Sequence, residues 1–166
     1  MGVNIALLTV TDTRTLETDK SGKILVDKIK KALHQLIDRK ICKDNKEDIK
    51  KILVEWTKLK DIDVIITTGG TGLTGRDITP EALDEIADKH IPGFGEVFRT
   101  ISLKTVGTSS IQSRACAILA NGKYIFALPG SSGGVTDAWD QILIHQLDIN
   151  HKPCNFVELF PRLKEK

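Results

Sequence analysis

The chain has 166 residues, of which 40% are apolar and 28% are charged, and its formal net charge is +2. This length and mixture are typical of one soluble globular domain, so we expect a single domain over residues 1–166. The small net charge gives no support for binding nucleic acid or a membrane through bulk charge. The apolar N-terminus has no basic leader and no spanning length, so we expect a cytoplasmic protein.

Cysteine and histidine spacing gives no sign of a transition-metal site. Cys42, Cys116 and Cys154 lie far apart and form no C-x-x-C pair, which argues against a zinc ribbon and against dithiol chemistry. We expect three buried free thiols. The four histidines show no ligand spacing either. Any metal is therefore expected to be a hard cation such as Mg²⁺, held by carboxylates and phosphate.

The first half of the chain alternates between strand patterns and helix patterns. Apolar runs rich in β-branched residues predict buried strands, whereas apolar residues three and four positions apart predict helices. Thr79 is expected to cap one helix, with Pro80 at its first position. The expected elements are strands over 3–11 and 63–68, a short candidate strand over 40–42, and helices over about 22–39, 46–60 and 80–90.

The second half predicts two helices, one hairpin and an irregular tail. Two apolar runs are joined by Asn121-Gly122, the residue pair favoured in type I′ turns, and this predicts a β-hairpin. A helix precedes the hairpin and another follows it. The expected elements are helices over 93–107 and 135–147 and hairpin strands over 115–120 and 124–129.

Strands that alternate with helices imply a mostly parallel sheet covered on both faces, and the hairpin adds one antiparallel strand at an edge. In such sheets, ligands bind beyond the carboxyl ends of the strands. Three polar loops with glycines follow predicted strands, at 12–22, 69–79 and 129–134. We expect these loops to converge on one crevice.

The stretch TTGGTGLTGRD at 67–77 is compatible with several kinds of site. It contains the G-x-G-x-x-G spacing of dinucleotide-binding loops, but Pro80 delays the helix that should begin inside the glycine run. It is also close to a Walker loop, with Arg76 and Asp77 in place of the lysine and the hydroxyl residue. Asp77 could bind Mg²⁺ that in turn grips a phosphate. A tight turn with Asp77 at a helix entry explains the pattern about as well.

The stretch Gly130–Gly134 matches the G-x-S-x-G pattern of a hydrolase nucleophile elbow, with Ser132 as the nucleophile. A hydrolase places its acid and histidine on later strands, and only a helix and a tail follow here. We therefore favour an anion-binding loop at a helix N-terminus. Asp44 and Asp77 both follow predicted strands, so these two carboxylates are candidates to share a metal.

Five segments together resemble the MoaB/MogA family of molybdenum cofactor biosynthesis proteins, from about residue 4 to residue 156. They are TDKSGKIL, TTGGTGLTGRDITPEAL, GFGEVFRTIS, GTSSIQSRA and FALPGSS, and both GFGEVFR and the KPCNF of the tail look more like MoaB than MogA. The resemblance implies a three-layer α/β/α sandwich of the MogA-like molybdopterin-binding type. It also implies that the chain binds molybdopterin, the dithiolene pterin that carries molybdenum.

The resemblance further implies an activity. MogA-like members use Mg²⁺ and ATP to adenylylate the terminal phosphate of molybdopterin and release pyrophosphate, and the product passes to a MoeA-like partner for molybdate insertion. The alternative is a non-catalytic module that binds the pterin and hands it on. The resemblance also implies a homotrimer or a hexamer of paired trimers, in which Phe156 and Phe160 of the tail could bury against a neighbouring subunit.

The family pattern assigns roles to residues of this chain. Asp44 and Asp77 match the two essential acids and would hold Mg²⁺. The nucleotide site would comprise Asp12, Gly69, Gly70, Thr71 and Gly72. The pterin and phosphate site would comprise the turn of Asp19, Ser21 and Gly22, the pair Ser113 and Arg114, and the loop residues Pro129, Gly130 and Ser131. Ser132 departs from many relatives, which have proline at that position.

Overall fold

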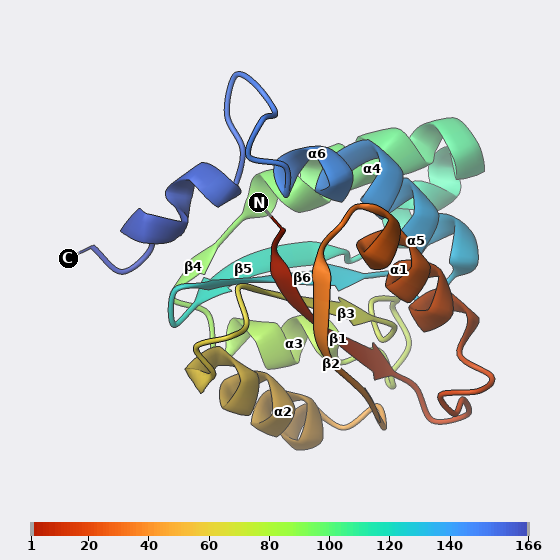
Figure 1. Cartoon of the computed structure of the whole chain (residues 1–166). Coiled ribbons are helices and arrows are strands. Elements are labelled where there is room, and N and C mark those ends of the chain that lie inside the picture. Colours follow the sequence, from red (N-terminus) through yellow and green to blue (C-terminus); the bar gives the residue numbers. More distant parts are fainter. Residues whose placement is uncertain (1, 166) are drawn as a thin grey trace.

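A computed structural model describes residues 2–165 and contains one six-stranded sheet between two layers of helices (Figure 1). The strand order is β2-β1-β3-β6-β5-β4, with β2, β1, β3 and β6 parallel and β5 antiparallel to both of its neighbours. The predicted fold class, a mostly parallel sheet with an antiparallel edge, is confirmed. The strands are β1 (Asn4–Val10), β2 (Gln35–Cys42), β3 (Val64–Thr68), β4 (Lys89–His90), β5 (Cys116–Ala120) and β6 (Lys123–Leu128).

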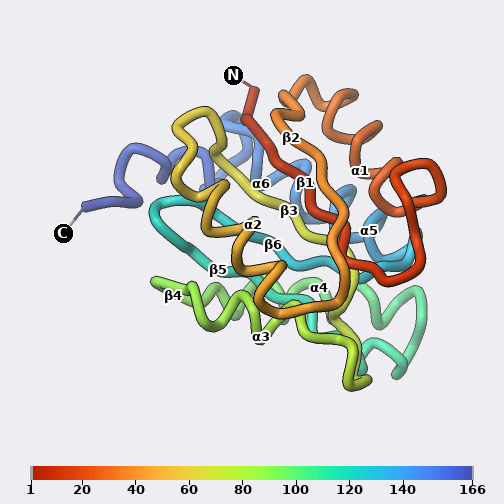
Figure 2. The backbone as a smooth tube through the Cα atoms, turned by 90° about the horizontal axis from the view of Figure 1, so that it is seen from below, coloured from red at the N-terminus to blue at the C-terminus, as the bar shows by residue number. Residues whose placement is uncertain are grey.

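The helices cover both faces of this sheet. On one face lie α1 (Lys20–Lys31), α4 (Pro92–Val106), α5 (Ser132–Ala138) and α6 (Ile144–Gln146), with a π-helical turn, Trp139–Leu143, that joins the last two. On the other face lie α2 (Lys46–Lys58) and α3 (Thr79–Asp84), which Figure 2 shows from below. Two 3₁₀ segments, Gly107–Gln112 and Val157–Arg162, complete the elements within residues 2–165.

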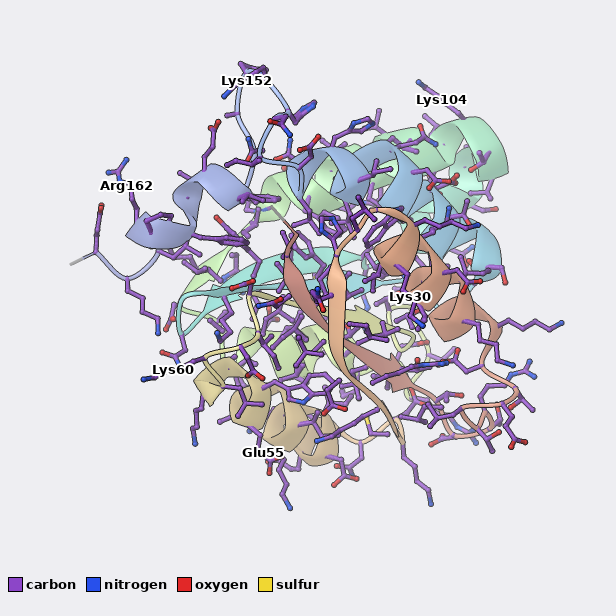
Figure 3. The ribbon with its side chains drawn as sticks, viewed as in Figure 1. Lys30, Glu55, Lys60, Lys104, Lys152 and Arg162 are labelled. Carbon is purple, nitrogen blue, oxygen red and sulfur yellow. The ribbon has the colours of Figure 1, made fainter. Side chains whose placement is uncertain are left out.

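The core is built by alternation along the central strands. In β1, Ile5 and Leu7 join the apolar cluster beneath α1 and α4, while Ala6 and Leu8 join the cluster against α2 and α3. All four side chains have no solvent exposure, as expected for strands that are covered on both faces. Charged side chains such as Lys60, Lys104 and Lys152 point outward into solvent (Figure 3). No helix within residues 2–165 is long and apolar enough to cross a membrane.

The predicted helix over 22–39 is wrong in its second half. The helix ends at Lys31, and the chain turns through Leu33 and His34 into β2, which pairs with β1 in parallel. Leu33, Leu36 and Ile37 have helical spacing in the sequence, but Leu33 is 83% exposed in the turn and the other two lie on an edge strand. The pattern misleads because an edge strand is only half covered, so its apolar residues do not alternate strictly.

Leu33 adopts φ +60° just after α1, a left-handed position that usually carries glycine. Its side chain has little burial to lose. We therefore expect Leu33→Gly to raise the free energy of unfolding by about 0.5 to 1 kcal/mol through relief of backbone strain. Denaturant unfolding should show a higher midpoint with an unchanged slope. A lower midpoint would mean that the turn holds leucine without strain.

Three smaller expectations are also corrected. The helix predicted over 80–90 ends at Asp84, and two residues of that range form β4. The thiols of Cys42 and Cys116 are only partly buried and that of Cys154 is exposed, so they are not three buried thiols. Phe156 and Phe160 are half-buried within this chain, where their ring centroids lie 4.6 and 5.8 Å from that of Tyr124, and their contact with a neighbouring subunit stays a prediction. The tail is a 3₁₀ helix over Val157–Arg162 rather than wholly irregular.

Candidate functional site

Two adjoining cavities lie beyond the carboxyl ends of β1, β3 and β6. A large cleft of about 700 Å³ is lined by the glycine loop 69–72, the loop 129–134 and the C-terminal half of α4 with the 3₁₀ segment after it. A small pocket of about 310 Å³ is lined by the loop after β1, the start of α1 and the same loop after β6. Both cavities include Gly69, Gly130 and Ser131. The three loops predicted to converge do so, and these shared residues are where they meet.

The glycine loop can form only with glycine at its first two positions. Gly69 has φ +102° and Gly70 has φ +67°, and a Cβ at Gly69 would lie 2.2 Å from the carbonyl oxygen of Val10. The hydroxyl of Thr79 donates to the Gly69 carbonyl at 2.9 Å and so ties the loop to the start of α3. Within residues 2–165 the N–H groups of Gly70 and Thr71 have no hydrogen-bond partner, which suits a loop that receives an anion.

Asp77 folds back against this loop. Its Oδ2 atom accepts from the N–H of Thr74 at 2.9 Å and from the Thr74 hydroxyl at 2.7 Å, and the carboxylate also accepts from the N–H of Gly72. A Cβ at Gly72 would lie 2.7 Å from Oδ2, so a larger residue there would displace the Asp77 carboxylate. Burial alone would raise the pKa of Asp77, but these hydrogen bonds outweigh it and hold the pKa below its usual value. Asp77 is therefore an anion across the physiological range.

Asp44 approaches the same loop from the other side. It follows β2, and its Oδ1 atom lies 3.3 Å from the place where a Cβ of Gly70 would stand. Its N–H donates to Oδ1 of Asp12 at 3.2 Å. Burial and the neighbouring charges of Asp12 and Asp77 raise the pKa of the Asp44 carboxyl. The glycine loop thus lies among three carboxylates whose charges are only partly neutralised, with Arg76 3.6 Å from Asp12 as the nearby cation.

These carboxylates suit Mg²⁺ that is also bound by substrate phosphates and water. They do not suit a metal whose ligands all come from the protein. Among residues 2–165 no group of three or more His, Cys, Asp or Glu side chains is arranged to enclose a metal ion. Mg²⁺ is commonly bound through one or two carboxylates and completed by substrate phosphates and water. The mutual repulsion between Asp44 and its acidic neighbours is the kind of charge excess that a cation relieves. The donor set is therefore suitable for Mg²⁺ bound together with a phosphate.

The small pocket is organised by a buried carboxylate. Asp19 is 1% exposed and accepts from the hydroxyls of Thr9 and Ser21 at 2.6 and 3.1 Å, and from the N–H of Gly22 at 2.9 Å. Arg39 of β2 completes the set with an ion pair at 2.9 Å. Burial raises the pKa of Asp19, but the four hydrogen bonds outweigh it and keep the pKa below its usual value. This network fixes the first turn of α1, whose Ser21 lines the pocket beside Arg14 and Lys20.

Arg114 is placed differently from the rest of its predicted group. Ser113 lines the large cleft, as do Pro129, Gly130 and Ser131. The guanidinium of Arg114 instead donates to the carbonyls of Gly72 at 2.7 Å and Asp77 at 2.6 Å, and it pairs with Glu81. It does not line the cleft. Arg114 therefore holds the glycine loop in shape from outside.

Comparisons with known proteins agree with this arrangement. A family model described as a probable molybdopterin binding domain matches residues 6–149. The chain belongs to this family. The chain is 45% identical over 161 residues to molybdenum cofactor biosynthesis protein B of Escherichia coli K12, which covers 97% of this chain and 93% of the relative.

Solved structures give the same result. A crystal structure of a molybdenum cofactor biosynthesis protein B superposes with a TM-score of 0.89 at 38% identity and covers 100% of this chain and 98% of that one. A structure of MogA superposes with a TM-score of 0.77 at 29% identity and covers 87% and 97%. The fold is therefore that of the MoaB and MogA proteins, and the cleft lies at the strand ends of this family fold.

The structure gives no support for the hydrolase alternative, because the serine and the histidines lie in different cavities. Ser132 lines the small pocket, whereas His145 and His151 line a separate cavity beside Phe94. Ser131, not Ser132, is engaged at the start of α5, where its hydroxyl accepts from the N–H of Gly134 at 3.1 Å. A serine without a histidine in the same cavity lacks the base that activates a nucleophile.

The charge excess at Asp44 is expected to lower the stability of the metal-free protein and to increase its stabilisation by Mg²⁺. An acid whose folded pKa is raised stabilises the fold only while protonated, and this contribution is lost as the pH rises through the raised pKa. At neutral pH, Asp44→Asn should therefore raise the free energy of unfolding of the metal-free protein by about 0.5 kcal/mol. Added Mg²⁺ should stabilise the wild type more than the variant. Thermal unfolding with and without Mg²⁺ measures both; a variant that is less stable without metal would contradict the account.

Proposed function

We propose that this chain acts in molybdenum cofactor biosynthesis as a molybdopterin adenylyltransferase. The reaction transfers the AMP group of ATP to the terminal phosphate of molybdopterin and releases pyrophosphate. The observation that carries the proposal is the position of Asp44 and Asp77, which lie against the glycine loop from two sides. A phosphate-binding loop flanked by two carboxylates and without a Walker lysine is suited to a nucleotide bound as its metal complex.

The parts of the site divide the work of such a transfer. Asp44 and Asp77 would hold Mg²⁺, which when bound offsets charge on the ATP phosphates and on departing pyrophosphate. The N–H groups of Gly70 and Thr71 can receive phosphate oxygens at the boundary of the two cavities. No residue needs to act as a nucleophile, because a phosphate oxygen of the pterin substrate attacks the α-phosphorus. Positioning and electrostatics supply the rate enhancement.

The two cavities differ in the ligand groups they suit. The small pocket carries Arg14 and Lys20 beside Ser21, which suits phosphates. The large cleft carries apolar side chains such as Val106 and Pro129 among many hydroxyl groups, which suits a polar ring system. Phosphates of both substrates would meet at Gly69, Gly130 and Ser131, the residues that both cavities share.

Pyrophosphate release tests the proposal directly. Purified protein mixed with molybdopterin, ATP and Mg²⁺ is expected to release one pyrophosphate for each pterin modified. Omission of the pterin, of ATP or of Mg²⁺ should each abolish the signal. Pterin binding without pyrophosphate in the complete mixture would reject the adenylyltransferase.

One observation favours a second candidate, a non-catalytic module that binds the pterin and hands it on. Oδ2 of Asp77 is already used to hold the loop through Thr74 and Gly72, so this carboxylate has a structural role that needs no metal. The module would bind molybdopterin without consuming ATP. In either case we propose a MoeA-like protein as the next acceptor and a homotrimer or hexamer as the assembly, which light scattering can test.

A further inference from the structure

One wall of the large cleft carries a carboxylate that the adenylyl transfer does not use. Asp137 lies on α5 and faces α4, where the hydroxyl of Thr105 donates to its Oδ2 atom at 3.1 Å. Among residues 2–165, Asp137 belongs to no ion pair, and Thr105 is its hydrogen-bond partner. Most of the acceptor capacity of the carboxylate is therefore open to a ligand.

The surroundings of Asp137 determine which ligand groups it can receive. The side chains that line the cleft include two carboxylates, Asp77 and Asp137, and no lysine, arginine or histidine. An anionic group would be repelled at this wall. Ser102, Ser109 and Ser110 add hydroxyl groups, and Val106, which is 54% exposed, adds apolar contact. The wall thus fits the face of a planar ring whose edge donates hydrogen bonds.

We propose that Asp137 recognises the 2-amino and N3–H edge of the pterin ring and so selects the substrate. This inference rests on the proposed function for its ligand, a pterin. The edge presents two adjacent donors, which match the two oxygens of one carboxylate in a paired, charge-assisted contact. Adenine offers one amino donor next to a ring nitrogen acceptor, and a carboxylate repels that acceptor. Guanine has the same donor pair as a pterin, so a guanine nucleotide is the competing occupant.

A pair of probes that differ at one group tests the contact. The probes are 6-hydroxymethylpterin and 6-hydroxymethyl-lumazine, in which a carbonyl replaces the 2-amino group and turns a donor into an acceptor. The wild type should bind the pterin at least about 10-fold more tightly in a fluorescence titration, the scale of one charged hydrogen bond. Asp137→Asn should reverse or abolish this preference, because its amide can donate to the carbonyl and accept from N3–H.

The control and the contradicting outcomes are specific. Asp140→Asn removes a carboxylate three residues along the same helical run, outside the cleft, and should keep the wild-type preference. Thermal unfolding confirms that both variants fold, since an asparagine at 137 can still accept from Thr105. Equal binding of the two probes by the wild type, or an unchanged preference in Asp137→Asn, overturns the proposal. GMP that binds the wild type more tightly than 6-hydroxymethylpterin, with a preference that depends on Asp137, also overturns it, because the subsite would then belong to a guanine nucleotide.

The test separates this inference from the adenylyltransferase proposal. A pterin preference that depends on Asp137, without pyrophosphate release, rejects the adenylyltransferase and supports the subsite. Pyrophosphate release without a preference for the 2-amino group rejects the subsite and supports the adenylyltransferase.

Discussion

Asp77→Asn is expected to lower the rate of pyrophosphate release about 10²- to 10³-fold, the usual scale for loss of one preorganised electrostatic group. The substitution removes the negative charge that would hold Mg²⁺ beside the glycine loop. The asparagine side chain has nearly the same shape as aspartate, and its amide oxygen can still accept from Thr74. Asparagine is thus a cleaner test than alanine, which would also release the loop.

The control for this result is Asp61→Asn, which removes an exposed carboxylate just before β3, at the opposite end of the sheet. Pyrophosphate release by that variant should equal that of the wild type. The Asp77→Asn variant should still bind 6-hydroxymethylpterin, because the proposed contact with the pterin ring is made by Asp137 on another wall of the cleft. A folded Asp77→Asn protein that releases pyrophosphate at the wild-type rate would remove Asp77 from the metal site.

Asp19→Ala is expected to lower the free energy of unfolding at neutral pH by about 3 to 5 kcal/mol, because it leaves the partly buried Arg39 without its partner. Asp19 also caps α1 through the N–H of Gly22 and fixes the hydroxyls of Thr9 and Ser21. Chemical denaturation measures the loss. Asp27→Ala, an exposed acid on the same helix, should change the stability by less than about 0.5 kcal/mol.

The pH dependence of the same variant gives an independent check. Because the folded pKa of Asp19 lies below its unfolded value, its stabilisation is present above the ordinary aspartate pKa and is lost as the pH falls through the lowered folded pKa. The difference between wild type and Asp19→Ala should therefore shrink in acid. A difference that stays constant from neutral pH into acid would show that Asp19 does not act through its charge.

Much of this fold was predictable because its central elements follow local rules. The buried runs at 3–11 and 63–68 lie where β1 and β3 form, and the pair Asn121-Gly122 turns with φ +48° and +72° as a type I′ hairpin requires. The convergence of three loops followed from the parallel sheet alone. The positive φ values of Gly69 and Gly70, in contrast, were not predicted from the glycine spacing and are seen only in the structure.

The parts that were missed depend on contacts distant in sequence. Arg39 was assigned to a helix, so its pairing with Asp19 across β1 and β2 had no local signal. The helices α1 and α3 end at Lys31 and Asp84 because the chain then enters the next strand of the sheet. No Gly or Pro marks these ends in the sequence. Asp137 belonged to no motif that indicated a binding role. Its place in the cleft, beside Thr105 of α4, is seen only in the folded chain. Glu81, the partner of Arg114, was likewise visible only in the folded chain.

The central claim is that the glycine loop between Asp44 and Asp77 positions ATP for transfer of its AMP group. The most direct measurement follows ATP labelled at the α-phosphorus, with Mg²⁺ and molybdopterin, in the wild-type protein. We predict that the label moves to the pterin product while unlabelled pyrophosphate is released, and that Asp44→Asn and Asp77→Asn block both. Label that stays in ATP while the pterin is bound, or a label at the γ-phosphorus that moves to the pterin instead, would contradict adenylyl transfer at this loop.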